Sequence, residues 1–231
     1  MRKNILIVGG SSGVGLEIAT RYISDGHNVC ITGRKNLNLN GATFVEFNID
    51  TNTSLLGKRI DGVIEKFPEI NTLVYSVGFY QEGHIDKLSE EEIILMTNVG
   101  LIAPMLFVQR LKNNNELPLK VILVTSSSEY TPREVEPVYC ATKAGLGMFG
   151  SSLVLDQEIG KVLVVAPSGI ATPFWDGTNK DTSEMLNSGW VADEIIRLSG
   201  GEFKYKYAKI LKNPPRTEVE ICNNNEGRSL L

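Results

Sequence analysis

The stretch IVGGSSGVG, residues 7–15, lies between a short apolar run and an amphipathic helical pattern. Three of its glycines have the spacing G-x-x-x-G-x-G. Where a strand turns into a helix, such glycines let the backbone approach a phosphate, and the helix N-terminus attracts its negative charge. Glycines also end strands without binding anything, but the position of this turn, the first in the chain, favours a pyrophosphate site. The residues expected to line it are Gly9, Ser11, Ser12, Gly13, Val14 and Gly15.

Short apolar runs continue along the chain. They lie at residues 4–8, 28–32, 43–47, 71–75, 120–125 and 161–166. Most are β-branched or aromatic and show little alternation, which is typical of strands buried on both faces of a parallel sheet. Between most of them, apolar residues recur three or four positions apart, as in amphipathic helices. The alternation predicts an α/β fold: a doubly wound parallel sheet, or Rossmann fold, in three αβα layers.

Residues 1–231 are expected to form this one nucleotide-binding domain. The connection at 34–42 is short and rich in asparagine, so at most a turn is expected there. A polar segment at 173–190 holds both tryptophans, which predicts a functional or mobile substrate loop. Residues 222–231 are expected to be a frayed tail.

Composition narrows the classes of function. The chain is 42% hydrophobic, with a formal net charge of −4 and interspersed acids and bases. This predicts neither a nucleic-acid groove nor a basic membrane patch, and no stretch reaches the ~20 apolar residues of a membrane span. Cys30, Cys140 and Cys222 lie far apart, which predicts reduced thiols, a cytoplasmic protein and no metal site.

The end of the second apolar run bears on the choice of nucleotide. It reads ITGRK, residues 31–35, and lacks the acid that commonly binds the ribose 2′-hydroxyl of NAD. Arg34 and Lys35 instead offer cations to a 2′-phosphate. We therefore expect NADP(H) to be preferred over NAD(H), although Arg34 could also simply solvate a loop.

The stretch YCATK, residues 139–143, places Tyr139 one helical turn before Lys143. A free phenol has a pKa near ~10, which is too high for a base at neutral pH. An ammonium within ~4–6 Å stabilises the phenolate and lowers that pKa. The pattern therefore allows proton transfer, but the same spacing also occurs on ordinary exposed helical faces.

Taken together, the ordered motifs resemble the short-chain dehydrogenase/reductase family in its single-domain form, from about residue 4 to 173. Val8 replaces the threonine that opens the glycine motif, and only Gly78 survives from the motif N-N-A-G. A serine stands thirteen residues before Tyr139 (139 minus 126). The other matching positions are Asp50, Asn98 and the segment PSGIAT from Pro167 to Thr172.

The resemblance implies roles for these residues. Tyr139 would be the acid/base, Ser126 would hold the substrate oxygen, and Lys143 would lower the pKa of Tyr139 and bind the nicotinamide ribose. Asn98 would anchor a proton-relay water. The cofactor set would further include Asp50, Gly78, Pro167, Ile170 and Thr172. Two alternatives stay open: Ser127 could replace Ser126, and Asn98 could merely bond to the backbone.

These expectations amount to a carbonyl reductase or alcohol dehydrogenase acting on a small molecule, with a catalytically degenerate nucleotide-binding sensor or scaffold as the alternative. Substrate-lining candidates are Phe79, Tyr80, Glu129, Tyr130 and Trp175. The resemblance also implies a homodimer or homotetramer. The family's common C-terminal strand and its Asp-Gly-Gly signature are not recognisable, and the chain ends TEVEICNNNEG before its last four residues.

Overall fold

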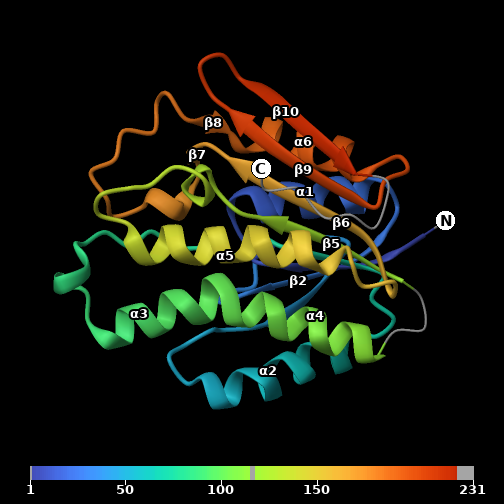
Figure 1. Cartoon of the computed structure of the whole chain (residues 1–231). Helices are drawn as coiled ribbons and strands as arrows, with labels where there is room; N and C mark the ends of the chain where they lie inside the picture. The colour runs from blue at the N-terminus through green and yellow to red at the C-terminus, as the bar shows by residue number, and fades with distance from the viewer. Residues whose placement is uncertain (1, 115–117, 223–231) are drawn as a thin grey trace.

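The main sheet has eight strands in the order β10-β9-β6-β5-β4-β1-β2-β3 (Figure 1). The computed structural model describes residues 2–114 and 118–222. The strands are β1 (Asn4–Val8), β2 (Asn28–Gly33), β3 (Ala42–Glu46), β4 (Thr72–Tyr75), β5 (Leu119–Val124), β6 (Ile159–Pro167), β9 (Tyr205–Leu211) and β10 (Arg216–Cys222). Two shorter strands, β7 (Ile170–Ala171) and β8 (Leu186–Asn187), pair with each other beside it.

The helices follow the strands as the apolar spacing predicts. They are α1 (Gly13–Ser24), α2 (Thr53–Lys66), α3 (Glu90–Thr97), α4 (Ala103–Asn114), α5 (Pro137–Leu153) and α6 (Ser188–Ser199). Short turns of helix are η1 (Ile85–Lys87), the π-helical η2 (Asn98–Ile102), η3 (Ser127–Glu129) and η4 (Pro173–Trp175). The connection between β2 and β3 contains no helix, as expected from its composition.

Two hydrophobic cores lie on opposite faces of the sheet, because successive strand residues point to opposite sides. Along β1, Leu6 and Val8 pack into one core, while Ile5 and Ile7 pack into the other. The first core is covered by α2, α4 and α5, and the second by α1 and α6 (Figure 1). All neighbouring strand pairs of the main sheet except β9 and β10 are parallel. The predicted doubly wound α/β fold is therefore confirmed.

The C-terminal region differs from the sequence expectation. A closing strand is present, because β9 pairs in parallel with β6 and β10 then pairs antiparallel with β9 at the edge. Tyr205 and Tyr207 of β9 are almost fully buried. The expectation rested on a missing signature, whereas burial of alternate apolar residues suffices to add a strand. Cys222 ends β10, and the rest of the expected tail, 223–231, lies outside the described residues.

Helices α3, η2 and α4 join into one helical stretch, Glu90–Asn113, with a mean hydropathy of 1.6 over its most apolar window. Contrary to the sequence expectation, it is long and apolar enough to span a membrane. This alone is a weak indication, because core helices of soluble proteins share the property. Met96, Val99 and Phe107 are each at most 5% exposed, and 44% of the most apolar window is buried, so burial within the protein accounts for part of the apolar composition.

Candidate active site

The predicted glycine turn lies at the carboxyl end of β1 and opens α1. Gly9 and Gly13 have φ values of +88° and +52°, which favour glycine. A Cβ on Gly15 would lie 2.2 Å from the carbonyl oxygen of Gly9, so helix and turn meet too closely for a side chain. Ser12 precedes α1 without capping it, and the first turn carries no acid. The free amide groups and the close backbone fit a bound pyrophosphate.

Arg34 follows β2 close to this turn. A Cβ on Gly33 would lie 2.0 Å from Oγ of Ser11, so the end of β2 touches the glycine turn directly. Arg34 and Lys35 are exposed, and within residues 2–114 and 118–222 neither forms an ion pair. Two cations therefore stand beside the turn with their charges available to a ligand.

Asn98 begins the π-helical turn η2, and its amide faces the loop after β3. Its Nδ2 donates to the Asp50 carbonyl oxygen at 2.9 Å, and its Oδ1 accepts from the Thr53 hydroxyl at 2.9 Å. The Asp50 carboxylate pairs with Arg59 at 2.7 Å, and the hydrogen bond from Arg59 lowers the Asp50 pKa. The structure therefore ties the side chain of Asn98 to the loop at Asp50 and to the start of α2.

Tyr75 fills the position of the first asparagine in the altered N-N-A-G motif. Its buried hydroxyl donates to the carbonyl oxygen of Val99 within η2 at 2.5 Å. A π-helical turn displaces a carbonyl from the regular helical pattern, and here a phenol from the central strand bonds one. The substitution thus links β4 to the bent helix, a role that the altered motif did not suggest.

Ser126, Tyr139 and Lys143 lie together where β5 ends against α5. Ser126 lies close enough to Tyr139 for its hydroxyl to act on the pKa of the phenol. Ser127 instead accepts a hydrogen bond from Arg133 at 3.1 Å on the exposed side. Nζ of Lys143 lies 5.5 Å from the centre of the Tyr139 ring and donates to the Val124 carbonyl oxygen at 3.2 Å.

The electrostatics of this group differ from the sequence expectation. The pKa of Tyr139 is raised, not lowered: burial is the main cause, and the hydrogen bond with Ser126 acts in the opposite direction. Lys143 is only 4% exposed, and burial lowers its pKa to about 8, while Glu129 raises it. Desolvation is the largest cause of the pKa shift in both groups, and a sequence pattern cannot report it.

The segment PSGIAT passes beside the glycine turn. A Cβ on Gly13 would lie 3.3 Å from Cβ of Thr172, and Gly78 is close enough to Lys143 that its Cβ would lie 3.9 Å from Nζ. The Ile170 carbonyl oxygen accepts from the Trp175 indole nitrogen at 2.9 Å. Pro167 ends β6 at the same edge of the sheet. Most of the predicted cofactor residues therefore converge on one edge, at the carboxyl ends of β1, β4 and β6.

An aromatic cluster, defined by Tyr80, Tyr139, Phe174 and Trp175, covers the catalytic candidates. The ring of Phe174 lies 6.1 Å from that of Tyr139, 6.1 Å from that of Tyr80 and 4.8 Å from that of Trp175. A Cβ on Gly78 would lie 3.5 Å from Phe174. Sequence reasoning missed Phe174, although it noted the segment in which it lies.

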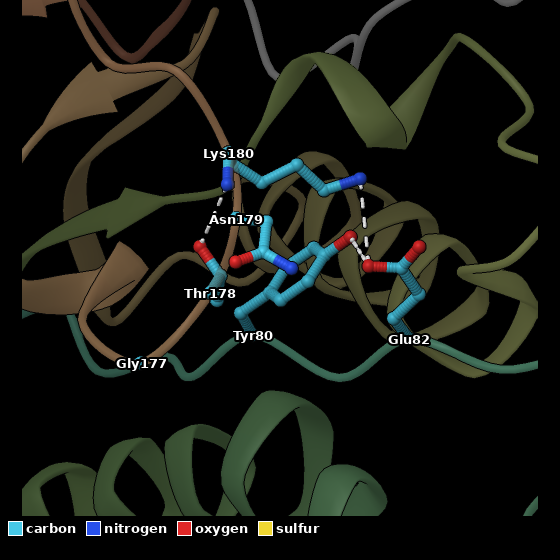
Figure 2. Close-up of a pocket in the computed structure, with 6 residues that line it drawn as sticks. All are labelled: Tyr80, Glu82, Gly177, Thr178, Asn179 and Lys180. Atoms are coloured by element: carbon cyan, nitrogen blue, oxygen red, sulfur yellow. Dashed lines mark hydrogen bonds and ion pairs between the residues drawn. The ribbon is translucent and has the colours of Figure 1, made fainter.

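A pocket of about 400 Å³ adjoins this cluster (Figure 2). Its lining residues are Tyr80, Glu82, Gly177, Thr178, Asn179 and Lys180. The Tyr80 hydroxyl donates to Glu82 at 2.6 Å, and Lys180 reaches across the Tyr80 ring to Glu82 at 3.4 Å. The pocket thus combines an aromatic wall with a neutralised ion pair. No motif in the sequence singled out Glu82 or Lys180.

The other predicted substrate residues lie elsewhere. Glu129 points beneath α5, where its carboxylate accepts from Thr125 at 2.6 Å. Tyr130 lies under Nζ of Lys209, at 4.6 Å, in a separate hollow of about 350 Å³ beside Cys140. Phe79 is half-buried beside Gly78 and makes no ring contact within the described chain. In that same part of the chain no three His, Cys, Asp or Glu residues gather as metal ligands.

Solved structures share this architecture. A short chain dehydrogenase from Burkholderia cenocepacia J2315, in complex with NADP, matches with a TM-score of 0.73 and 24% identity, over 87% of this chain and 91% of that one. A 3-ketoacyl-(acyl-carrier-protein) reductase from Brucella melitensis, complexed with NADH, matches with a TM-score of 0.75 and 19% identity, over 90% and 96%. At these identities the likeness establishes the fold.

Sequence comparison establishes the family. An uncharacterized oxidoreductase, DltE, of Bacillus subtilis (strain 168) is 34% identical over 208 residues, which are 84% of this chain and 81% of that protein. The 3-oxoacyl-[acyl-carrier-protein] reductase MabA of Mycobacterium bovis is 26% identical over 166 residues, 71% and 66% of the two chains. The family model described as short chain dehydrogenase matches residues 3–183. The chain therefore belongs to the short-chain dehydrogenase/reductase family of oxidoreductases.

Proposed function

We propose that this enzyme interconverts a carbonyl group and a secondary alcohol, with NADP(H) as its preferred cofactor. The observation that carries the proposal is the buried ammonium of Lys143, 5.5 Å from the centre of the Tyr139 ring, with Ser126 close to the same phenol. All three lie at the sheet edge that holds the glycine turn, where an α/β sheet binds its ligands.

Tyr139 is the proton donor in the reductive direction. Its raised pKa keeps the phenol protonated at neutral pH, which suits a general acid. Ser126 holds the substrate oxygen next to that phenol. Lys143 offsets the negative charge that Tyr139 acquires when the proton leaves. When bound, the nicotinamide cofactor supplies or accepts the hydride.

The glycine turn would hold the pyrophosphate, and Arg34 would pair with a 2′-phosphate. An exposed guanidinium without an ion-pair partner in the described chain supports this preference. Ile170 and Thr172 would bind the carboxamide end, and Thr172 lies beside Gly13. The relay role of Asn98 stays a prediction, because its amide is already bonded to Asp50 and to Thr53.

The substrate would be a small molecule that extends from Tyr139 along the aromatic cluster toward the pocket of Figure 2. Tyr80 and Trp175 are the predicted substrate residues that support this path, since their rings lie 5.1 Å apart beside Phe174. Glu82 and Lys180 at its end would favour a polar group of low net charge.

One observation favours the alternative of a sensor or scaffold without turnover. Phe174 packs on both Tyr139 and Gly78, where a nicotinamide ring and a substrate would have to fit. In a sensor this contact would persist when the nucleotide is bound. In an enzyme the turn η4 would move aside before each reaction.

A panel of aldehydes and ketones, followed by NADPH and NADH absorbance, separates the two functions. The enzyme proposal expects turnover of at least one compound, with Tyr139→Phe lowering kcat by about 10³-fold or more while NADPH still binds. Tyr130→Phe is the matched control, because this tyrosine lies outside the aromatic cluster. Tight NADPH binding without oxidation of the cofactor by any compound would favour the sensor.

The oligomeric state and the cellular compartment belong to the same proposal. We infer a homodimer or homotetramer in the cytoplasm. Met148 on α5 and Leu155 just after it are 44% and 57% exposed, which leaves apolar surface for a second copy. Cys30 and Cys140 are free thiols, in keeping with a reducing compartment. A single monomeric species in sedimentation at micromolar concentration would contradict the assembly.

A further inference from the structure

Glu129 occupies an unusual place for a carboxylate, beneath the helix that carries Tyr139 and Lys143. Its Oε2 accepts from the hydroxyl of Thr125 at 2.6 Å. On its other side, a Cβ on Gly147 would lie only 2.2 Å from Oε1. Glycine inside a helix costs about 1 kcal/mol relative to alanine. Here the missing side chain makes room for the carboxylate.

The ammonium of Lys143 lies near this carboxylate, at the end of β5. Lys143 lies one helical turn before Gly147, so the two positions share a face of α5. Its Nζ donates to the carbonyl oxygen of Val124 at 3.2 Å, and the next residue, Thr125, donates to Glu129. The ammonium and the carboxylate therefore flank one peptide unit at the end of β5.

Few other charges surround Lys143. Tyr139 and Cys140 are titratable neighbours on α5, and Glu136 at the start of that helix acts on Tyr139. Gly78 and Phe174 face it from the opposite side and carry no charge. Glu129 is the charged group that acts on Lys143 and opposes the effect of its burial. A buried ammonium without such a counter-charge tends to lose its proton.

We propose that Glu129 is a positioning residue that keeps the ammonium of Lys143 charged and fixed beside Tyr139. The inference rests on the proposed function of Tyr139 and Lys143. Glu129 touches neither the substrate path nor the glycine turn. It acts through Lys143. The absent side chain of Gly147 on α5 leaves the space that the Glu129 carboxylate occupies.

The first test follows Lys143 itself, independently of turnover. Lysine side-chain NMR signals are titrated in the full chain, with the Lys143 signal assigned by its loss in Lys143→Arg. Glu129→Gln should move the Lys143 midpoint to lower pH, because the counter-charge is gone. Glu134→Gln, an exposed carboxylate five residues along the chain, should leave it in place. An unchanged midpoint in Glu129→Gln would overturn the proposal.

The second test uses a substrate from the carbonyl panel. Glu129→Gln should bring the alkaline fall of kcat/KM to lower pH, so that its kcat/KM at pH 8 drops on the order of threefold to tenfold against wild type. Glu129→Asp keeps the negative charge on a shorter side chain and should recover part of the lost kcat/KM at pH 8. If wild type turns over no substrate, the proposed function fails while the NMR titration still decides this inference. If the wild-type and Glu129→Gln profiles coincide, only the inference fails.

A double-mutant cycle tests the geometry without relying on either readout. Gly147→Ala places a methyl group on the carboxylate, so it should lower Tm clearly in the wild-type background. In a Glu129→Ala background the same change should be nearly neutral or stabilising, because the space is empty and alanine favours the helix. Equal losses of Tm in both backgrounds would show that Glu129 does not lie beneath Gly147, and the proposal would fall.

Discussion

Two lysines at opposite ends of the parallel strands, the buried Lys143 and the half-buried Lys120, have pKa values lowered in the same way. Burial lowers the pKa of Lys143, at the carboxyl ends of the strands, to about 8, and does the same to Lys120 at the start of β5. Each ammonium donates to a main-chain carbonyl: that of Val124 at 3.2 Å for Lys143 and that of Ser199 at 2.6 Å for Lys120. By titration alone the two lysines look equivalent.

Their neighbours distinguish them. Lys143 faces a phenol and a carboxylate at a ligand-binding edge, whereas Lys120 lies among Lys3, Lys161 and Lys206. Lys120 and Lys206 meet the end of α6, where Lys206 donates to the carbonyl oxygen of Leu198 at 2.7 Å. Cations at a helix C-terminus bond its last carbonyls and offset its dipole. A shifted pKa therefore indicates a functional site only where a reactive partner lies beside it.

The largest expected effect separates the two lysines by activity. Lys143→Met should lower kcat by about 10²-fold or more, because Tyr139 loses the nearby positive charge. Lys120→Met should leave kcat within about twofold, because it changes the far edge of the sheet. Steady-state kinetics on a substrate from the carbonyl panel measure both. Circular dichroism would show whether both variants fold. An equal loss of kcat in two folded variants would mean that Lys143 is no more important for the reaction than Lys120.

A second expected effect concerns cofactor choice at the carboxyl edge. Arg34→Ala should weaken NADPH binding by about tenfold to a hundredfold, since a charge-assisted hydrogen bond contributes roughly 1.5–3 kcal/mol. NADH binding should change little. Fluorescence titration with both cofactors gives the ratio, and Lys120→Met is the control that should leave it unchanged. An NADPH-to-NADH ratio untouched by Arg34→Ala would remove the basis for an NADP(H) preference.

The next effect is a pH dependence of stability that arises at the amino edge. Because Lys120 titrates near 8 when folded and near 10.5 when unfolded, the unfolded chain binds more protons between these values. Its contribution to the free energy of unfolding therefore rises with pH across that window, by on the order of 3 kcal/mol. Lys143 and Lys206, whose pKa values are also lowered by burial, add to the rise in wild type.

The variant Lys120→Met isolates the contribution of Lys120 to this pH dependence of stability. Urea unfolding at pH 7, 8, 9 and 10 should show that the stability of Lys120→Met relative to wild type is greatest at pH 7 and declines toward pH 10. The variant also loses the bond to Ser199, which shifts the whole comparison by a constant. A relative stability that does not depend on pH would mean that Lys120 titrates normally in the folded protein.

Local patterns explain what could be predicted from the sequence. The six apolar runs, the glycine turn and the spacing of Tyr139 and Lys143 each depend on residues close together in the chain. The strand β9 was missed because its place depends on pairing with β6, far away in the sequence. Phe174 was missed because only tertiary folding brings η4 onto Tyr139. The direction of the Tyr139 pKa failed for a related reason: desolvation depends on everything that surrounds a group, not on its spacing from a lysine.

The smallest expected effect tests whether the lysines of the amino edge influence one another. Lys161 donates to the Gly201 carbonyl oxygen at 2.8 Å and pairs with the exposed Glu202, and its charge lowers the pKa of Lys120. Lys161→Gln should change the free energy of unfolding by less than about 1 kcal/mol, since its contacts lie near the surface. It should also start the Lys120-linked rise in stability at a higher pH, because one repelling charge is gone. If the rise stays where it is in wild type, the charge of Lys161 plays no part in setting the pKa of Lys120.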